Sequence, residues 1–308
     1  MPDSPYFSQV EAELAHLGLV QFAPHAALRP WVQRYFWVKT ANCPEAMHLD
    51  LSHEKLSSNP SSSSIPPETA LTSGFTQRLY PDGGSTLTCH FSKGHLPDIR
   101  FYASQVVCEQ LYPQGVEQLS VRFYPGGAFH LLGLELQSLM SAGAWVDIDA
   151  SLCQLPGLER FRQQLAEATS RAACIQLLDG WLMSLVSILF SQKAAGQSLV
   201  QATLPLLLQT HSSLEHFYEQ VPLSRRQFER KFKAETGLSP LQIQQFSKIK
   251  LARNLLSYVP HMSLAEVALA SGFYDQAHLN QQFVRFTEQT PGQYKKRKMS
   301  QISKAPKD

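Results

Sequence analysis

The chain has 308 residues, of which 44% are hydrophobic and 17% charged, a composition that excludes a disordered or collagenous chain and predicts about two globular domains. The formal net charge of +2 conceals two opposite parts: residues 1–199 carry 12 Lys and Arg against 17 Asp and Glu, whereas residues 200–308 carry 15 against 8. The second part is therefore expected to meet an anionic partner, either nucleic acid or a membrane surface.

The first part, residues 1–190, is predicted to contain antiparallel strands over about 28–145. Short apolar runs between Gly and Pro turns predict strands at 28–38, 78–80, 85–91, 99–103, 105–111 and 119–123. Residues 52–68 are rich in Ser and Pro and predict a loop without its own core. Strict alternation in 85–91 places Cys89 on the apolar face, which favours packing over a nucleophilic role.

Two helices are predicted over about 155–190, because apolar residues recur there at intervals of three and four. They are expected to pack as a helical hairpin that completes an N-terminal sensory or assembly domain. The polar segment 191–199 is the predicted linker. A C-terminal domain is then expected over 200–298, with a flexible tail at 299–308, so that the fold class is α+β with an all-α second domain.

The C-terminal domain begins with a helix-turn-helix pattern. Residues 213–220 predict a short helix that ends before Pro222. Ser224 and Gln227 have the spacing of a capping box and predict a second helix, RRQFERKFKAET, which Gly237 ends. This arrangement of helix, tight turn and helix is the outline of a helix-turn-helix unit.

The second helix of this unit has one apolar and one cationic face. Phe228 and Phe232 lie four residues apart and therefore share the buried face. The residues that fall elsewhere on the helix are Arg225, Arg226, Glu229, Arg230 and Lys233. Arginine can donate two hydrogen bonds to guanine in the major groove, and cations at the margins can neutralise phosphates.

The outline occurs a second time after a long helix predicted over 241–258. Ser263 and Glu266 form the next capping box, and Asp275 is the expected N-cap of the helix QAHLNQQFVRF. The amide side chains of this helix suit adenine. Because a helix of about 18 residues spans roughly 27 Å, the two units could enter successive major grooves on one face of DNA, with no need for a dimer.

Residues 214–294 resemble the DNA-binding domain of AraC/XylS-type transcription regulators, most clearly in SLAEVALASGFYDQAHLNQQFVRFTEQTPGQYKK. The resemblance implies a sequence-specific regulator of transcription, more often an activator, that binds double-stranded promoter DNA, with RNA polymerase as a candidate further partner. By position, the implied base contacts are Arg226, Glu229, Arg230, Gln276, Ala277, His278, Asn280 and Gln281.

The chain departs from the family pattern at two positions. Gln281 stands where the family usually has Arg, and Glu288 stands where it usually has Gly; the first removes a donor and the second adds a negative charge near a helix end. The predicted phosphate contacts are Ser224, Arg225, Lys233, Lys248, Lys250, Arg285 and Lys295.

The N-terminal part resembles an uncharacterised domain found ahead of AraC-type DNA-binding halves in bacteria, on LRPWVQRYFWV, LYPDGGSTLTCHF and VRFYPGGAFHLLG. The resemblance implies a domain that senses a small-molecule effector, of unknown identity, or organises a homodimer. An alternative is that this domain binds only protein.

A different class of function is a DNA-associated enzyme, such as a repair protein that accepts an alkyl group on Cys89 or Cys108. Such a thiol needs a neighbouring base or helix N-terminus, and the sequence shows neither, so we expect no enzyme. No C-x-x-C or H-x-H pair occurs, so no metal and no cofactor are expected. The absence of a signal-peptide pattern and of 18 consecutive apolar residues predicts a cytoplasmic protein that does not enter a membrane.

Overall fold

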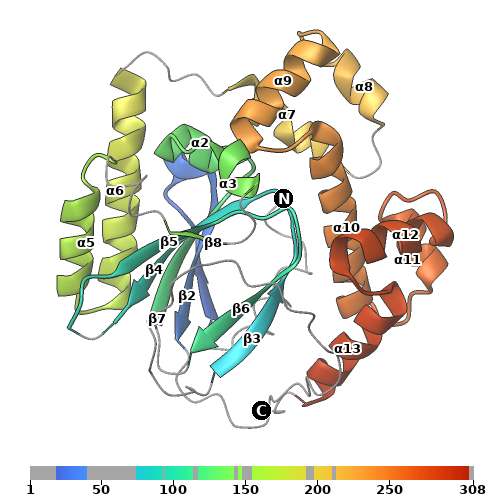
Figure 1. Cartoon of the computed structure of the whole chain (residues 1–308), viewed down its shortest axis with the longest axis horizontal. Coiled ribbons are helices and arrows are strands. Elements are labelled where there is room, and N and C mark those ends of the chain that lie inside the picture. The colour runs from blue at the N-terminus through green and yellow to red at the C-terminus, as the bar shows by residue number, and fades with distance from the viewer. Residues whose placement is uncertain are drawn as a thin grey trace.

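The computed structural model describes most of the predicted elements. The described residues are 19–39, 74–92, 94–113, 117–141, 145–147, 155–191, 198–209 and 213–304. The predicted loop 52–68, most of the predicted linker and the last four residues of the predicted tail lie outside them. The predicted fold class is confirmed: an antiparallel sheet with a helical hairpin precedes an all-helical C-terminal part (Figure 1).

The N-terminal part is built around a six-stranded antiparallel sheet. Its strands, in spatial order, are β1 (Leu19–Phe22), β2 (Val32–Lys39), β7 (Glu117–Phe123), β4 (Ser85–Phe91), β5 (Asp98–Tyr102) and β8 (Trp145–Asp147). Strands β3 (Gly74–Leu79) and β6 (Cys108–Pro113) pair separately. Within the large sheet, Leu87 lies opposite both Phe101 and Val121, which places three apolar side chains in one row.

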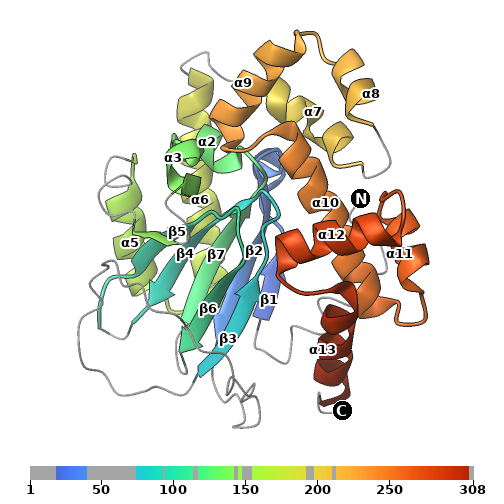
Figure 2. The same ribbon diagram turned by 45° about the vertical axis from the view of Figure 1, so that its right-hand side comes forward.

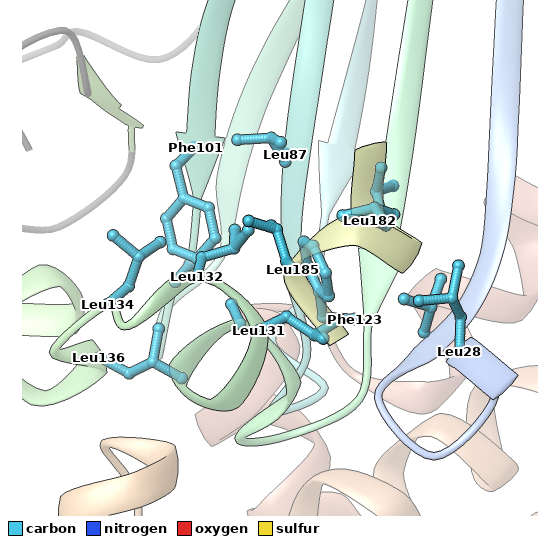
Figure 3. Packing of buried hydrophobic residues seen from close by; sticks show 14 of the residues in the cluster. Leu28, Leu87, Phe101, Phe123, Leu131, Leu132, Leu134, Leu136, Leu182 and Leu185 are labelled. Atoms are coloured by element: carbon cyan, nitrogen blue, oxygen red, sulfur yellow. The ribbon is translucent and has the colours of Figure 1, made fainter. Parts of the chain in front are cut away.

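Helices cover one face of this sheet. They are η1 (Ala26–Leu28), α2 (Gly127–Leu132), α3 (Leu136–Ser141), α5 (Leu158–Glu167) and α6 (Arg171–Ser191). Figure 3 shows Leu182 and Leu185 of α6 beside Leu131 of α2 and Phe123 of β7, and all four are fully or almost fully buried in one cluster. The α5–α6 hairpin is confirmed, and Phe161 of α5 stacks on Trp181 of α6 with ring centroids 4.7 Å apart.

Helix α6 is, among the described residues, the one helix long and apolar enough to cross a membrane, over Arg171–Ile188. The core helix of a globular protein passes the same test. Here Leu178, Leu182 and Leu185 are buried in the cluster that contains the sheet, so the apolar face of α6 has a partner within the chain.

The C-terminal part contains two helix-turn-helix units joined by a long helix. The first unit comprises α8 (Leu214–Glu219) and α9 (Arg225–Thr236), preceded by α7 (Leu199–Leu207). The joining helix is α10 (Pro240–Tyr258), and the second unit comprises α11 (Leu264–Ala270) and α12 (Gln276–Thr287), followed by α13 (Pro291–Lys304). Figures 1 and 2 show α10 beside the sheet, with one unit at each end. The segment predicted as a tail is helical as far as Lys304.

The predicted helix ends are confirmed in detail. Ser224 with Gln227, and Ser263 with Glu266, form complete capping boxes, and Asp275 accepts a hydrogen bond from the backbone N–H of His278 at 2.7 Å. These caps satisfy N–H groups that a helix cannot pair internally. At the starts of the two second helices, α9 and α12, Ser224 and Asp275 each accept a hydrogen bond from the backbone N–H three residues later, whereas the Ser263 capping box begins α11.

The repeat continues past the second helices with a constant offset of 51 residues. Phe232 and Phe283 are both fully buried, and Thr236 and Thr287 donate hydrogen bonds to their carbonyl oxygens at 2.8 and 2.7 Å. The helices α10 and α13 then start with equivalent capping boxes, Ser239 with Gln242 and Thr290 with Gln293. Each unit is thus one copy of the same structural motif.

The hydrophobic core divides inside α10 and not at the predicted linker. One cluster runs from the sheet through α7, α8 and α9 to Ile243 and Phe246 of α10. A second cluster begins at Ile249 and contains α11, α12 and Tyr294 of α13. The first helix-turn-helix unit therefore shares its core with the N-terminal sheet, while the second unit has a core of its own.

A buried carboxylate links the first unit to the N-terminal part. Glu235 of α9 is 4% exposed, and its carboxylate accepts hydrogen bonds from His130 Nε2 at 2.8 Å and Ser198 Oγ at 2.6 Å, with Lys231 Nζ at 3.1 Å. Burial alone would raise the pKa of Glu235, but these donors outweigh it and hold the pKa below its ordinary value of 4.5.

Acid is therefore expected to weaken this contact. A carboxyl group with a lowered pKa contributes stability above its ordinary pKa and loses it as the pH falls through the folded-state value. The difference in free energy of unfolding between wild type and Glu235→Gln should shrink as the pH falls from 7 to about 3. Denaturant titrations at several pH values measure this difference. It isolates Glu235, because the other carboxylates titrate alike in both proteins. A difference independent of pH would contradict this role.

Candidate nucleic-acid interface

The second helix of the first unit, α9, turns a cationic face outward. Phe228 and Phe232 are fully buried, whereas Arg226, Arg230 and Lys233 are exposed. The side chains of these three cations make no hydrogen bond or ion pair with any described residue. They are therefore available to an external anion or hydrogen-bond acceptor, as the spacing of the sequence predicts.

Glu229 lies on the same helix but is held by two neighbours. Its Oε1 atom accepts hydrogen bonds from Tyr218 Oη at 2.7 Å and Arg225 Nε at 2.9 Å, and Arg225 lies over the Tyr218 ring at 4.9 Å. The hydrogen bonds from Tyr218 and then Arg225 lower the pKa of Glu229. Sequence reasoning missed Tyr218, because it belongs to the preceding helix and no local pattern pairs it with Glu229.

The second helix of the second unit, α12, presents polar side chains. Leu279 and Phe283 are buried, while Gln276, Ala277, His278 and Gln281 are exposed and Asn280 is half-buried. The His278 ring packs edge-on against Phe273 in the preceding turn, with centroids 5.4 Å apart. The exposed residues at the start of α12 therefore include no Lys or Arg, whereas those of α9 include arginines.

The predicted phosphate contacts divide into two groups. Lys233 and Arg285 are exposed. Lys248 donates a hydrogen bond to the Gly272 carbonyl at 2.8 Å, and Lys295 donates one to the Met262 carbonyl at 3.0 Å. Each ammonium group has two further N–H donors, so these lysines also brace the turns of the second unit while retaining capacity for a phosphate.

The structure places Lys250, a third predicted phosphate contact, against the N-terminal part. Its Nζ atom lies 3.4 Å from Asp82 Oδ2, and Asp82 also pairs with Arg122. Burial opposes ionisation of Asp82, but the charges of Arg122 and Lys250 and the Gly84 N–H prevail and hold its pKa well below the ordinary range. No sequence pattern marks Asp82 as a partner of Lys250, because 168 residues separate them.

One of the two thiols considered for an enzymatic role, that of Cys89, has an environment that disfavours the nucleophilic form. Cys89 is 1% exposed on the apolar face of β4, as predicted, and burial raises the pKa of its thiol to about 12. A thiol with that pKa is almost entirely protonated at neutral pH, and the thiolate is the nucleophilic form.

Comparisons with known proteins place these helices in a family context. Residues 218–297 match a family model described as a helix-turn-helix domain. Over 74 residues the chain is 38% identical to the HTH-type transcriptional regulator MtrA of Neisseria gonorrhoeae. The aligned residues make up 24% of this chain and 24% of MtrA. The chain therefore spans about a quarter of the length of this curated relative.

Several solved structures also match, including two that cover different shares of this chain. One is the DNA-binding domain of AdpA in complex with a target DNA, at 27% identity, covering 35% of this chain and 95% of that one, with a TM-score of 0.31. The other is ToxT from Vibrio cholerae O395, at 11% identity, covering 73% of this chain and 94% of that one, with a TM-score of 0.35.

Proposed function

We propose that this chain, whose residues 218–297 form a helix-turn-helix domain of the AraC type, is a sequence-specific DNA-binding regulator of transcription. The observation that carries the proposal is the repeated unit itself. Two second helices, α9 and α12, are fixed by equivalent caps and buried residues at opposite ends of α10, and each leaves a row of hydrogen-bonding side chains exposed. We call α9 and α12 the recognition helices.

The recognition helices would read different bases. Arg226 and Arg230 of α9 suit guanine O6 and N7, and the carboxylate of Glu229 suits the amino group of cytosine. On α12, the amide groups of Gln276, Asn280 and Gln281 suit adenine, Ala277 suits the thymine methyl group, and His278 supplies a further ring nitrogen. The chain would therefore bind a composite site, with a guanine-containing element for α9 and an adenine-rich element for α12.

Phosphate contacts would fix the register of both helices on DNA. Arg225, Lys233 and Arg285 are exposed cations, and Ser224, Lys248, Lys250 and Lys295 complete the proposed set. The 19 residues of α10 span about 28 Å, close to the roughly 34 Å between successive major grooves on one face.

We propose further that the N-terminal domain modulates this binding and that the protein acts as an activator in the bacterial cytoplasm. The support is the shared hydrophobic cluster, which couples the sheet to the first unit directly. A ligand or partner that favours one arrangement of the N-terminal domain would shift the population of DNA-binding conformations. Contact with RNA polymerase, pairing with a second copy and binding of a small-molecule effector stay predictions.

Arg230→Ala is expected to weaken binding to the cognate site by about 1–3 kcal/mol, because it removes a two-pronged contact with one base. The site is first selected from random-sequence DNA with wild-type protein. Gel-shift titrations on that site, and on the same site with single base changes, should show relaxed preference at one position. Equal affinity of variant and wild type would exclude Arg230 as a base contact.

Two further variants calibrate that experiment. Lys233→Ala should weaken binding to all sequences similarly and reduce the slope of affinity against salt by about one, since a phosphate contact carries no sequence information. Arg160→Ala removes an exposed cation of α5, far along the chain from the recognition helices, and should leave binding unchanged. If Arg230→Ala lowers the affinity for all DNA sequences equally, Arg230 is a phosphate contact and not a base contact.

A further inference from the structure

The connection between β3 and β4 touches both halves of the C-terminal part. We call residues 78–84, which are the last two residues of β3 and the connection that follows them, the interdomain strap. Gly83 packs so closely on α10 that an added Cβ would lie 2.3 Å from Ile243 Cδ1, and Ile243 belongs to the first hydrophobic cluster. Tyr80, three residues earlier, packs against the second cluster. The strap therefore crosses the division between the two cores, where α10 runs from one cluster into the next.

Tyr80 makes the most extensive contacts of the strap. The Arg253 guanidinium lies over its ring at 3.8 Å, Arg297 donates a hydrogen bond to its hydroxyl at 2.7 Å, and Tyr294 meets it edge-on at 6.0 Å. These partners come from α10 and α13, which frame the second unit. A planar guanidinium stacked on an aromatic face is a directional contact, so it defines an orientation as well as a position.

Arg78 extends the strap to the end of the second recognition helix. It pairs with Glu288, the C-cap of α12, at the position where the sequence departs from the usual Gly. Glu288 is the one residue other than Gly with a positive φ among those described, at 57°. A side chain there costs conformational free energy that glycine would not. The Glu288 side chain is 57% exposed, so solvent screens this ion pair and its contribution to the stability of α12 is modest.

The first recognition helix ends on the N-terminal domain in a similar way. Its C-cap Gly237 has a φ of 76° and lies so close to α3 that an added Cβ would be 2.9 Å from the Leu136 carbonyl oxygen. Glu235 adds the hydrogen bonds from His130 and Ser198. The N-terminal domain thus holds both recognition helices at their C-terminal ends, and the exposed side chains proposed to read bases lie toward their N-terminal ends.

We propose that the interdomain strap sets the orientation of α12 relative to α9, with Arg78 and Tyr80 as positioning residues for the second DNA element. This inference rests on the proposed function. Apart from the strap, the two units are joined through α10, whose buried residues change cluster between Phe246 and Ile249, and through Phe286 of α12, which packs against both clusters. With it, the N-terminal domain is attached to both units, so the spacing at which the recognition helices meet DNA is fixed from outside the DNA-binding domain.

The first test needs no DNA. Hydrogen–deuterium exchange of full-length protein is measured for wild type, Arg78→Glu and the charge-swapped pair Arg78→Glu with Glu288→Arg. We expect faster exchange in α12 and α13 for the single variant and recovery in the swapped pair. Arg100→Glu is the matched control, because Arg100 pairs with Asp98 inside the N-terminal domain. Unchanged exchange in the single variant, or failure of the swap to restore it, would overturn the proposal.

Tyr80→Phe provides a variant with minimal risk to folding. It retains the ring beneath Arg253 and removes the hydroxyl that accepts a hydrogen bond from Arg297. Exchange in α13 should rise by less than in Tyr80→Ala, which removes both contacts. Equal exchange in wild type and Tyr80→Ala would show that Tyr80 does not hold the second unit.

The second test uses the selected DNA site and a copy with one extra base pair between its two elements. Wild type should lose roughly tenfold in affinity on the lengthened site, the scale of one poorly matched contact. Arg78→Glu should bind the original site more weakly and discriminate less between the two, and the charge swap should restore discrimination. Identical discrimination in all three proteins would overturn the proposal.

The same experiment separates this inference from the proposed function. If Arg230→Ala loses affinity on the site while the strap variants behave as wild type, the proposed DNA-binding function is supported and the strap proposal fails. If wild type selects no DNA sequence, the proposed function fails, and hydrogen exchange alone decides whether the strap holds the second unit.

Discussion

Phe232→Ala is expected to lower the free energy of unfolding of the N-terminal sheet and the first helix-turn-helix unit together by about 3–5 kcal/mol, the usual cost of truncating a buried phenylalanine. Phe232 is fully buried, and Phe228 packs on it with ring centroids 5.6 Å apart. Both residues belong to the cluster that continues into the sheet. A cavity at Phe232 therefore weakens a core that the N-terminal domain also uses.

Tryptophan fluorescence measures this effect, because all four tryptophans, at positions 31, 37, 145 and 181, lie in the N-terminal part. The midpoint of thermal unfolding followed by this signal should fall by roughly 10 °C in the variant. An N-terminal domain that folded independently of the first unit would keep its wild-type midpoint, and that result would contradict a shared core.

Phe283→Ala is the same truncation at the equivalent position of the second unit, 51 residues later, and its effect should remain there. Phe283 is fully buried and meets Tyr294 of α13 with centroids 5.5 Å apart, inside the second cluster. We expect the second unit to lose about 3–5 kcal/mol of stability. The tryptophan midpoint should change by far less than in Phe232→Ala.

Hydrogen exchange, measured for each helix and strand, tests whether the effect of Phe283→Ala stays within the second unit. Amides of α11, α12 and α13 should exchange faster in Phe283→Ala, while those of β4, β7 and α6 should keep wild-type protection. On the selected DNA site, the variant should lose its preference at the second element and retain it at the first. Accelerated exchange in the sheet as well would show that the two cores unfold as one.

Local chemistry made the helix-turn-helix units predictable from sequence. Capping pairs such as Ser224 with Gln227 require particular residue types at fixed short spacing, and they mark helix starts to within one residue. Strand β4 was predicted with its observed bounds, 85–91, because its apolar and polar residues alternate, although Thr88 of the polar face is also buried in the fold. The exposed face of α9 followed from the same periodicity.

The contacts between distant segments could not be predicted in this way. Periodicity shows which face of a helix is apolar, but not which other face it meets, so the shared cluster and the pairing of Glu235 with His130 had no sequence signal. Lys250 illustrates the effect on the candidate site. Its charge predicted a phosphate contact, which stays a prediction, but no pattern in the sequence indicated that its place on α10 also brings it against Asp82 of the strap.

Glu288 shows how a departure from a family pattern acquires meaning from structure. As sequence it is a negative charge near the end of a helix. In the fold its carboxylate reaches Arg78, so the residue that stands in place of glycine ties α12 to the N-terminal domain. The base contacts proposed for α12 stay predictions, and Gln281 is exposed at its family position.

The uneven division of the core also bears on how the chain folds as it is synthesised. The first cluster draws on residues from Leu28 to Phe246, so it cannot be completed until the beginning of α10 has left the ribosome. The second cluster of buried residues spans Ile249 to Tyr294 and closes within a short stretch of chain, which favours rapid folding. The nascent N-terminal part therefore keeps the apolar surface that contacts α7, α9 and the start of α10 uncovered until these helices emerge, and protection by chaperones matters most in that interval.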